Sequence, residues 1–322
     1  MKKLLLAAVL TTALAGLAVT AEAKDLLYGA ILKTPANPHW NAMTQGIEEA
    51  AKKVGVQAVV STVTDESAAE QQLNNCESML LRKPDALIVG AINSNILLPC
   101  LKSASDAGIA IVDLDYNLDR SIAEGAGVKV TFTAGNDGEK TGAVGADFIV
   151  AGLGADAAGP VLVLEGLPGN PVGAARGKGF RDRIATVAPK LVATTQNGDW
   201  DRGKSANITN DTLQRNPDLK AVFAANDTMA LGASEALLAA GRNDVIVIGV
   251  DGTSDAIQSI RSGRLTATVG QFPYLVGARS VELLTDMIKN GAKLETYQAT
   301  GQSVITKKAL DEGTDEMIKY LR

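Results

Sequence analysis

Short apolar segments rich in β-branched residues alternate with helical segments along most of the chain, and this alternation constrains the fold more than any other feature. The first series comprises segments predicted at Leu26–Leu32, Asn41–Val54, Val56–Val63, Ala68–Arg82, Ala86–Gly90, Ile96–Ala107 and Ile109–Leu114. Strands separated by helices form βαβ units, which build a parallel sheet with helices on both faces. The pattern therefore predicts an α/β fold.

The pattern restarts with a predicted strand at Val128–Thr133 and continues to an extended segment at Tyr297–Ile305. Asparagine recurs just after predicted strands in both series, at Asn37, Asn93, Asn170 and Asn226. Such faint internal similarity indicates two like-folded lobes rather than a solenoid. Each lobe is expected to be a doubly wound parallel sheet.

No Pro- or Ser-rich linker separates the two series, so several short crossings are expected to form a multi-strand hinge near 114–130, 251–254 and 271–275. The N-terminal lobe is predicted to contain residues 24–129 and 272–300, and the C-terminal lobe residues 130–271 and 301–322. Short, multiple crossings favour hinge closure over free tumbling.

The first 23 residues have the pattern of a signal peptide. Lys2 and Lys3 precede the uncharged apolar run Leu4–Val19, and Ala21-Glu22-Ala23 fits the A-x-A cleavage pattern. A membrane anchor is the alternative, but the run is shorter than the roughly 20 residues that cross a bilayer. We expect an exported protein that is cleaved near Ala23.

Charge and composition exclude several functional classes. The net charge is −5 and there are no basic runs, which argues against nucleic acid as a partner. The chain has one histidine, His39, and no C-x-x-C motif, so neither a metal nor a redox cofactor is expected. Cys76 and Cys100 flank the predicted strand Ala86–Gly90, and the sequence leaves open whether they form a disulfide or remain two buried thiols.

Polar side chains follow three predicted strands of the second series. Asn226, Asp251 and Gln271 come directly after the runs 221–225, 245–250 and 266–270. Ligands bind at the carboxyl ends of strands in open α/β sheets, because adjacent loops diverge there. Amide and carboxylate groups at these points suit a ligand with many hydroxyls, which needs no nucleophile.

Two tryptophans are candidates for the walls of such a site, and the core is otherwise aliphatic, with aromatics at 4%. Trp40 ends the segment KTPANPHW, which opens a helix after the first strand and contains Lys33 and Asn37. Trp200 lies between two aspartates, which makes it an improbable core residue. An aromatic face suits the C–H side of a sugar ring. The alternative is that Trp40 packs in the core and Asn37 only caps the helix.

Charged residues near the predicted strand ends allow binding and enzymatic interpretations. Arg176 can fork onto two hydroxyls, or it is an ordinary cation on the helix surface. Asp113 and Asp115 are expected on one face of a strand end, where one binds ligand and the other fixes the hinge. Paired carboxylates also suit a glycosidase, but the sequence shows no sign of an acid with a raised pKa. His39 lacks a Ser or Cys partner, so it is expected to line the site.

The chain resembles the periplasmic sugar-binding proteins of ABC transporters, in the ribose-, allose- and galactose-binding group. The resemblance covers nearly all of the chain after the signal peptide and is carried by these segments: KTPANPHW, LDY, GNPVGAARGKGF, GDWDRGK, LQRNPDLKAVFAANDTMALG, VIGVDG and TATVGQFP. The D-allose-binding type is the most similar member, with Lys33, Trp40 and the DWDR segment.

The resemblance implies a type I periplasmic binding protein that captures a monosaccharide or polyol between two lobes and delivers it to an ABC permease. It implies ligand contacts from Lys33, Asn37, Trp40, Asp115, Arg176, Trp200, Asn226, Asp251 and Gln271. The expected location is the periplasm, and a chemoreceptor is a second candidate partner.

Two residues depart from the family pattern. His39 stands where the family often has Phe, and Tyr116 stands where the ribose-binding type has Arg. Both departures concern the identity of the sugar rather than the sugar class. The alternatives are a signal-molecule binder on the same fold and a secreted glycoside-acting enzyme. The effector domain of a repressor shares the fold, but here a signal peptide stands in place of a DNA-binding headpiece.

Overall fold

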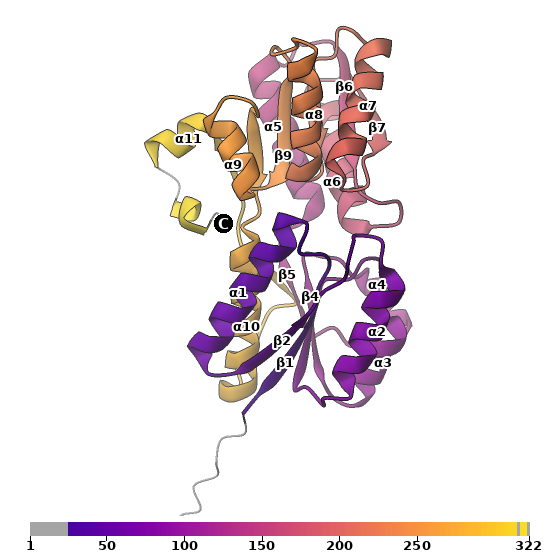
Figure 1. The fold of residues 1–322 in the computed structure, drawn as a ribbon, viewed down its shortest axis with the longest axis vertical. Helices are drawn as coiled ribbons and strands as arrows, with labels where there is room; N and C mark the ends of the chain where they lie inside the picture. The colour runs from indigo at the N-terminus through magenta and orange to yellow at the C-terminus, as the bar shows by residue number, and fades with distance from the viewer. Residues whose placement is uncertain (1–24, 314–315, 321–322) are drawn as a thin grey trace, which may run out of the picture.

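The computed structural model describes residues 25–313 and 316–320 as two α/β lobes, each built around one sheet (Figure 1). The predicted signal peptide, residues 1–23, lies outside the described residues. The first sheet has the strand order β11-β5-β4-β3-β1-β2, and its strands pair in parallel. These strands are β1 (Leu27–Ile31), β2 (Gln57–Ser61), β3 (Ala86–Val89), β4 (Ala110–Leu114), β5 (Phe132–Gly135) and β11 (Tyr297–Ala299).

The second sheet has the order β12-β10-β9-β8-β6-β7. Its strands are β6 (Gly159–Glu165), β7 (Leu191–Asn197), β8 (Ala221–Ala224), β9 (Ile246–Asp251), β10 (Ala267–Gly270) and β12 (Ser303–Thr306). Pairing is parallel except at the edge, where β12 runs antiparallel to β10. The prediction of two doubly wound, parallel-sheet lobes is confirmed.

Helices cover both faces of each sheet, because side chains of buried parallel strands alternate between two apolar layers. In the first lobe, Ala30 joins the layer under two long helices and the next residue, Ile31, joins the opposite layer. The helices of this lobe are α1 (Pro38–Val54), α2 (Ala69–Leu80), α3 (Leu98–Asp106), α4 (Arg120–Gly125) and α10 (Pro273–Asn290). Helices α1 and α10 lie together on one face, and α2, α3 and α4 on the other (Figure 1).

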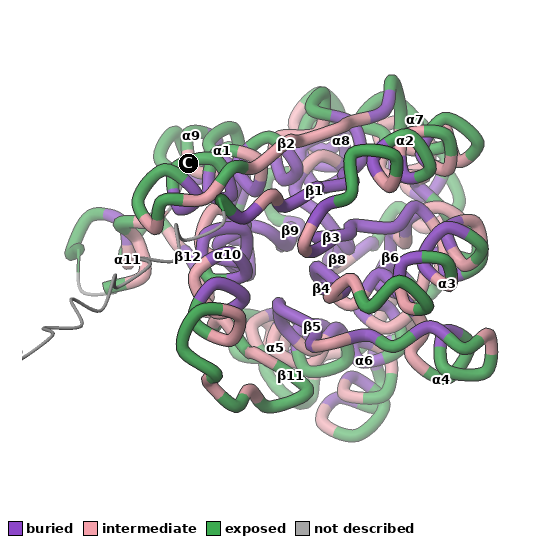
Figure 2. The backbone as a smooth tube through the Cα atoms, turned by 90° about the horizontal axis from the view of Figure 1, so that it is seen from below, coloured by how far each residue is buried: buried purple, intermediate pink, exposed green. Residues whose placement is uncertain are grey.

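The second lobe repeats this arrangement. Its helices are α5 (Gly138–Leu153), α6 (Pro171–Val187), α7 (Arg202–Arg215), α8 (Asp227–Ala239), α9 (Ser254–Arg261) and α11 (Lys307–Glu312). Phe180 of α6 stacks on Phe223 of β8 in one layer, while Met229 of α8 lies in the opposite layer. Figure 2 shows that most strand segments are buried, whereas the outer surfaces of the helices are exposed.

Cys76 of α2 and Cys100 of α3 form a disulfide, with a Cα–Cα distance of 6.2 Å. The structure thus decides between the two alternatives that the sequence left open. The bond joins two of the three helices on one face of the first sheet.

The chain crosses between the sheets after β5, after β10 and between β11 and β12. The predicted boundary between residues 129 and 130 is wrong, because β5 pairs with β4 in the first sheet. The crossings expected near 114–130 and 251–254 are also wrong, since β4 and β5 share the first sheet and β9 and β10 the second. The predicted boundaries at 271/272 and 300/301 fall at the other two crossings. Strand partners depend on distant contacts, which local patterns do not encode.

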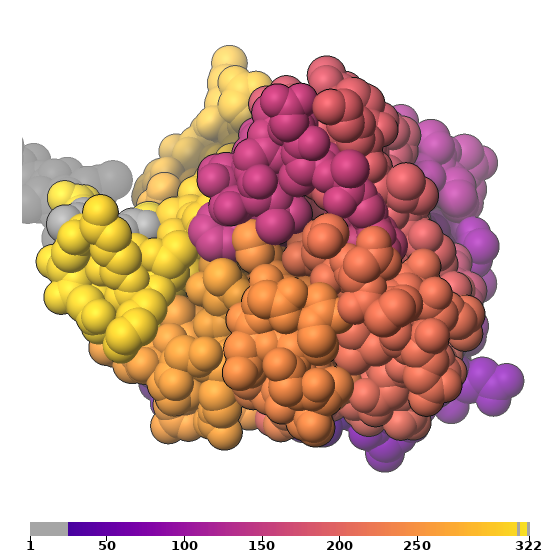
Figure 3. All heavy atoms as spheres, turned by 90° about the horizontal axis from the view of Figure 1, so that it is seen from above, coloured from indigo at the N-terminus to yellow at the C-terminus, as the bar shows by residue number. Residues whose placement is uncertain are grey.

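Hydrogen bonds tie the three crossings side by side. The Asn136 amide donates to the Gln271 carbonyl at 3.5 Å and to the Thr300 hydroxyl at 3.2 Å. The Gln271 amide donates to Gln302 at 3.1 Å. Beyond the last crossing, α11 forms a projection at one side of the second lobe (Figure 3). In the described part of the chain, every helix is too short or too polar to cross a membrane.

Candidate functional site

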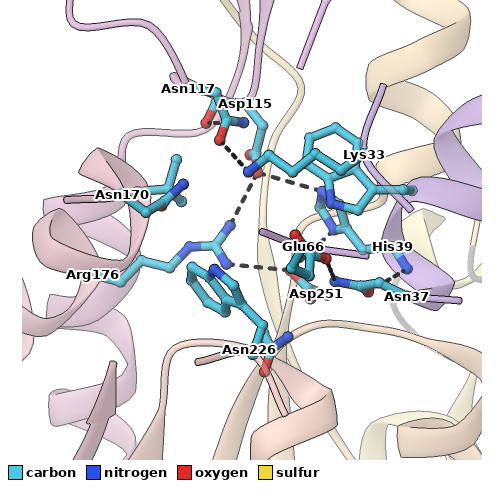
Figure 4. Close-up of a pocket in the computed structure, with 13 residues that line it drawn as sticks. Lys33, Asn37, His39, Glu66, Asp115, Asn117, Asn170, Arg176, Asn226 and Asp251 are labelled. Carbon is cyan, nitrogen blue, oxygen red and sulfur yellow. Dashed lines mark hydrogen bonds and ion pairs between the residues drawn. The ribbon is translucent and has the colours of Figure 1, made fainter. Parts of the chain in front are cut away.

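The carboxyl ends of the parallel strands in both sheets face a pocket between the lobes (Figure 4). The pocket is lined by Lys33, Asn37, His39, Trp40, Glu66, Asp115, Asn117, Asn170, Val172, Arg176, Trp200, Asn226 and Asp251. Every predicted ligand residue except Gln271 is in this lining. The structure therefore brings the predicted residues together, although which of them touch a ligand stays a prediction.

Trp40 belongs both to the pocket and to the apolar core of the first lobe. The side chain is 4% exposed and packs against the strand-end glycine Gly90, where an added Cβ would overlap the ring. Asn37 caps α1, since its Oδ1 accepts the His39 backbone N–H at 3.1 Å, and its Nδ2 donates to Glu66 at 2.7 Å. The sequence allowed this segment either to line a ligand site or only to cap α1 and pack in the core. Both are compatible, because capping and core packing hold the segment against the pocket.

Lys33 follows β1 and is almost fully buried, with its ammonium 4.9 Å from the centre of the Trp40 ring. Its Nζ donates to Asn117 Oδ1 at 2.8 Å. Burial lowers the pKa of Lys33, although nearby Glu66 and Asp115 oppose the change. The side chain is held in place by a hydrogen bond and an aromatic face.

The second lobe contributes Arg176 from α6 and Asn226 from the N-terminus of α8. Arg176 donates to the Ala225 carbonyl at 2.7 Å, which aims its guanidinium at the pocket. Asn226 Oδ1 caps α8 by accepting from Met229 N–H at 2.9 Å. The Asn226 Nδ2 group is buried and has no partner, so a donor is available beside the pocket.

Trp200 lines the pocket from the second lobe, whereas Trp40 lines it from the first. The Trp200 ring packs over Gly166, where an added Cβ would overlap the ring, and over Gly173, where an added Cβ would be in tight contact at 3.1 Å. Unlike Trp40, Trp200 is partly exposed, and it also lines a groove of about 530 Å³ at the outer edge of the pocket. Glycines therefore leave room for both tryptophan rings: Gly90 beneath Trp40, and Gly166 and Gly173 beneath Trp200.

Four buried charges form a closed ring across the two lobes. Arg176 lies 3.5 Å from Asp115 Oδ2 and 3.4 Å from Asp251 Oδ1. His39 lies 3.4 Å and 3.1 Å from the same two oxygens. These are ion-pair distances, while neither His39 nitrogen makes an aligned hydrogen bond. Two cations therefore share two carboxylate oxygens, and the contacts Arg176–Asp115 and His39–Asp251 join opposite lobes.

The ring perturbs the titration of its members. Burial disfavours charged His39, but Asp251 and Asp115 outweigh burial and raise the pKa of His39 to about 10. Burial likewise opposes charge on Asp115, but Arg176, His39 and Lys33 hold the pKa of Asp115 below its usual value. His39 is therefore a cation at neutral pH. The only histidine of the sequence thus completes the ring instead of acting as a base.

Left-handed backbone conformations cluster around the pocket. Asp115 and Tyr116 have φ values of 58° and 57°, Asp199 and Trp200 have 54° and 64°, and Asp251 has 126°. Each such conformation costs a non-glycine residue about 1–3 kcal/mol and persists only where its surroundings impose it. The structure maintains this strain at three predicted ligand residues.

Gln271 lies behind the pocket rather than in its lining. Its backbone N–H donates to the Asp251 carbonyl at 2.9 Å, and its side chain donates to Thr141 at 3.1 Å. The side chain is buried among the crossings of the hinge. The structure therefore gives Gln271 a place in the hinge, and direct contact with ligand remains only a prediction.

Four lining residues were not predicted: Glu66, Asn117, Asn170 and Val172. Asn170 had a signal in the sequence, since it is one of the asparagines that follow strands. It caps α6 and donates to the Ile92 carbonyl at 3.1 Å, which adds another contact between the lobes. Glu66 and Asn117 lie in loops whose positions follow from tertiary packing.

The sequence showed no sign of an acid with a raised pKa near Asp115, and the structure corrects this at Asp113. Burial raises its pKa well above the usual value, so an acid with a raised pKa does lie near Asp115. Asp113 does not line the central pocket, because its carboxylate accepts from the Leu118 N–H and the Thr133 hydroxyl. Within residues 25–313 and 316–320, no group of three His, Cys, Asp or Glu side chains is arranged to hold a metal ion.

Comparisons with known proteins agree with this geometry. Residues 28–293 match a model of the periplasmic binding protein domain. The D-allose-binding periplasmic protein of Escherichia coli is 35% identical over 266 residues, covering 82% of this chain and 85% of that protein. The ribose import binding protein of Bacillus subtilis is 36% identical over 272 residues, covering 84% of each chain.

Solved structures show the same architecture. A solute-binding protein of an ABC transporter from Actinobacillus succinogenes, solved with D-allose, has a TM-score of 0.83 and 31% identity, covering 89% of this chain and all of that one. A solute-binding protein from Agrobacterium vitis, solved with D-fucose, has a TM-score of 0.82 and 27% identity, covering 92% and 99%.

Proposed function

Because this chain belongs to the periplasmic binding protein family, we propose that it captures a monosaccharide or related polyol between its lobes and delivers it to an ABC permease. Allose- and ribose-like sugars are the proposed ligands, by similarity to the relatives that carry these names. The observation that carries the proposal is the buried ring of Asp115, Arg176, Asp251 and His39 in a pocket that Trp40 and Trp200 also line.

The ring supplies the chemistry that a polyhydroxylated ligand requires. Carboxylates of Asp115 and Asp251 accept hydrogen bonds from hydroxyls, while Arg176 and the free Asn226 amide donate them. Trp40 and Trp200 offer apolar faces for the C–H sides of a sugar ring. An epimer would leave one of these buried groups unpaired, so discrimination between epimers is expected to be steep.

The charges of the pocket favour an uncharged ligand. Among the described residues that line it, the basic side chains Lys33, His39 and Arg176 are matched by the acidic side chains Glu66, Asp115 and Asp251. A sugar acid or sugar phosphate would bring an unbalanced charge into a buried site, which is costly. The proposed class is therefore a neutral sugar.

Binding requires movement of the lobes. The cavity enclosed by the side chains is about 30 Å³, which is room for about one water molecule. A sugar can enter only when the contacts Arg176–Asp115, His39–Asp251 and Asn170–Ile92 open. The three adjacent crossings supply the hinge for this opening, and closure would bury the ligand.

The proposed location is the periplasm, with residues 1–23 as the signal peptide that directs export. The proposed partner is the permease of an ABC transporter, as the solute-binding relatives imply. Nothing in the site or the comparisons favours a chemoreceptor, so the proposal includes the permease alone. N-terminal sequencing of the exported protein tests the cleavage near Ala23.

A hydrolytic function is not proposed. Nearby cations lower the pKa of Asp115 and keep it ionised. Asp113 has a raised pKa, but its carboxylate accepts hydrogen bonds from the Leu118 N–H and from the Thr133 hydroxyl of β5. The pocket therefore lacks the free acid that glycoside hydrolysis needs beside a nucleophile or base. Glycosides that stay intact after long incubation with the protein would support this exclusion, and their cleavage would overturn it.

The test is calorimetric titration with D-allose, D-ribose and D-galactose, and with D-galacturonate as the charged comparison. We expect one or two neutral sugars to bind at roughly micromolar Kd, with no binding of galacturonate. Arg176→Ala should weaken binding by about a hundredfold or more, because two buried carboxylates lose a partner. Arg183→Ala is the matched control, since Arg183 lies on the same helix and its side chain is 42% exposed and pairs with Asp147 on the surface.

Two outcomes would contradict the proposal. Absence of binding to every sugar, with folded protein, would move the ligand outside the sugar class. Equal affinities for Arg176→Ala and the wild-type protein would show that the charge ring does not contribute to sugar binding.

A further inference from the structure

A second buried aspartate stands behind each of the two aspartates that face the pocket. Asp113 precedes Asp115 by two residues on β4, and its side chain is 1% exposed. Asp227 is the first residue of α8 and is fully buried behind Asp251. Neither residue lines the central pocket, so the proposed binding function does not account for them.

Asp227 holds the turn that directly follows Asp251, the last residue of β9. One carboxylate oxygen, Oδ2, accepts the backbone N–H of Gly252 at 2.9 Å, the backbone N–H of Thr253 at 2.7 Å and the Thr253 hydroxyl at 3.1 Å. The other oxygen accepts the hydroxyl of Thr268, on the neighbouring strand β10, at 2.6 Å. Asp251 itself has a φ of 126°, which a non-glycine residue rarely adopts.

Asp113 makes the corresponding contacts in the first lobe. One oxygen accepts the Leu118 backbone N–H at 3.1 Å, which closes the loop that contains Asp115 and Tyr116. The other accepts the hydroxyl of Thr133 on the neighbouring strand β5 at 3.2 Å. In both lobes, therefore, a buried carboxylate joins the loop after a pocket aspartate to a threonine on the next strand.

We propose that Asp113 and Asp227 are positioning residues, which hold Asp115 and Asp251 in left-handed backbone conformations that aim their carboxylates into the pocket. The inference rests on the proposed function, because it is in sugar binding that these carboxylates act. A left-handed non-glycine residue persists only when its surroundings impose the conformation, and these hydrogen bonds impose it.

The titration of the two residues supports this arrangement. Burial raises the pKa of Asp113 well above its usual value, and burial together with the charge of Asp251 raises that of Asp227 to about 7. Each pocket aspartate instead faces the cations Arg176 and His39. The cost of charge thus falls on the buried Asp113 and Asp227, and the lowered pKa of Asp115 keeps that pocket carboxylate ionised.

The test combines amide hydrogen exchange of the ligand-free protein with sugar titration of the same variants. In Asp227→Ala, the amide of Thr253 loses its acceptor, so its exchange should accelerate by about tenfold or more relative to wild type. The amide of Gly252 keeps the Thr268 hydroxyl as a second acceptor at 3.3 Å, so its exchange should accelerate less. In Asp113→Ala, the amide of Leu118 should respond as that of Thr253 does. Asp227→Asn should restore slow exchange, because its carbonyl can accept both amides while its NH₂ faces Thr268.

Affinity provides the second measurement, with D-allose and D-ribose as probes. Asp227→Ala should weaken binding by roughly tenfold to a hundredfold, and Asp227→Asn should stay within about threefold of wild type. Thr209→Val is the control, since it removes a buried hydroxyl of α7 in the same lobe, bonded only to Ser205 of its own helix. This control should change neither the local exchange nor the affinity.

The outcomes separate this inference from the proposed function. If wild type binds no sugar, the proposed function fails, while the exchange of Gly252 and Thr253 still decides whether Asp227 holds the turn. Unchanged exchange in Asp227→Ala would overturn the inference, as would unchanged affinity in a variant of a sugar-binding wild type. If Asp227→Ala does not fold, Thr268→Val removes one bond to Asp227 and should produce a smaller change of the same kind.

Discussion

The two lobes build their halves of the pocket in the same way at the strand ends but differ in how they hold their aromatic walls. In each lobe, an aspartate with a left-handed backbone faces the pocket, backed by a buried aspartate and a threonine on the next strand. Trp40 of the first lobe is part of the core and 4% exposed, whereas Trp200 of the second lobe lies in a loop and is partly exposed. The polar contacts are thus built alike in the two lobes, while the two tryptophans differ in burial.

This difference shows that Trp40 contributes to the stability of its lobe, whereas Trp200 does not. Trp40 belongs to α1 and packs against the strands beneath that helix, so its position follows from folding of the first lobe. Trp200 depends on the small residues Gly166 and Gly173 and on a strained turn. The first lobe is also stapled by the disulfide Cys76–Cys100, and sequence composition allows no second bond, because the chain has only these cysteines.

The largest expected effect is on the stability of the first lobe when Trp40 is truncated. Trp40→Ala removes a buried aromatic side chain, which typically costs about 3–5 kcal/mol of unfolding free energy. Urea unfolding, followed by hydrogen exchange of β1 and β3, should show the loss in the first lobe. A variant as stable as wild type would show that the ring is dispensable to the core and would remove this contrast between the lobes.

Loss of the disulfide should also destabilise the first lobe alone. Cys76→Ser with Cys100→Ser opens a loop with a sequence separation of 24, and such a bond is worth about 3 kcal/mol in the chain-entropy model. Hydrogen exchange of α2 and α3 should accelerate, while that of α7 and α8 should not. Equal acceleration in both lobes would show that the lobes unfold as one unit.

A smaller effect is expected from Trp200→Ala, and it should appear in sugar affinity rather than in stability. Removal of one aromatic wall should weaken binding by at least about tenfold, which corresponds to 1.4 kcal/mol. Melting temperature should change little, because Trp200 is partly exposed. Calorimetric titration beside thermal unfolding measures both quantities. Unchanged affinity would remove Trp200 from the site.

The smallest effect, taken per pH unit, is a slope in the pH dependence of stability that originates in the second lobe. Burial and then the charge of Asp251 raise the pKa of Asp227 from 3.8 to about 7. The folded state therefore binds this proton more tightly, so the stability it contributes is full below pH 3.8 and is lost as pH rises to about 7. One such group contributes a slope of at most about 1.4 kcal/mol per pH unit.

Asp227→Asn should flatten this slope, as measured by urea unfolding at several pH values within the range. His39 is a separate contribution, because its pKa is raised from 6.5 to about 10 and its stabilisation is lost only as pH rises through that higher range. Asp115 acts in the opposite sense, since its lowered pKa means that stability is lost at acidic pH. A variant with the wild-type slope would contradict the assignment to Asp227.

Much of the site was predictable because ligand residues of open α/β sheets follow strands. Asn226, Asp251 and Asp115 were found in this way, and the structure places all three in the pocket lining. Glu66 was not found, because no quoted motif contains it. Val172 lies in the quoted segment GNPVGAARGKGF, but its apolar side chain offers no hydrogen bond that would mark it as a ligand residue. His39 was assigned to the lining, but its bridge between Asp115 and Asp251 depends on how the two lobes meet.

The sequence by itself determined the fold class and the two-lobe plan, because the period of apolar residues specifies strands and helices locally. Tertiary structure alone decided which sheet receives β5, that Cys76 and Cys100 pair, and that Gln271 lies in the hinge rather than in the pocket lining. The physical reason is that strand partners, sulfur distances and contacts between lobes are relations between residues far apart in the chain. A local pattern specifies each element but not its neighbours.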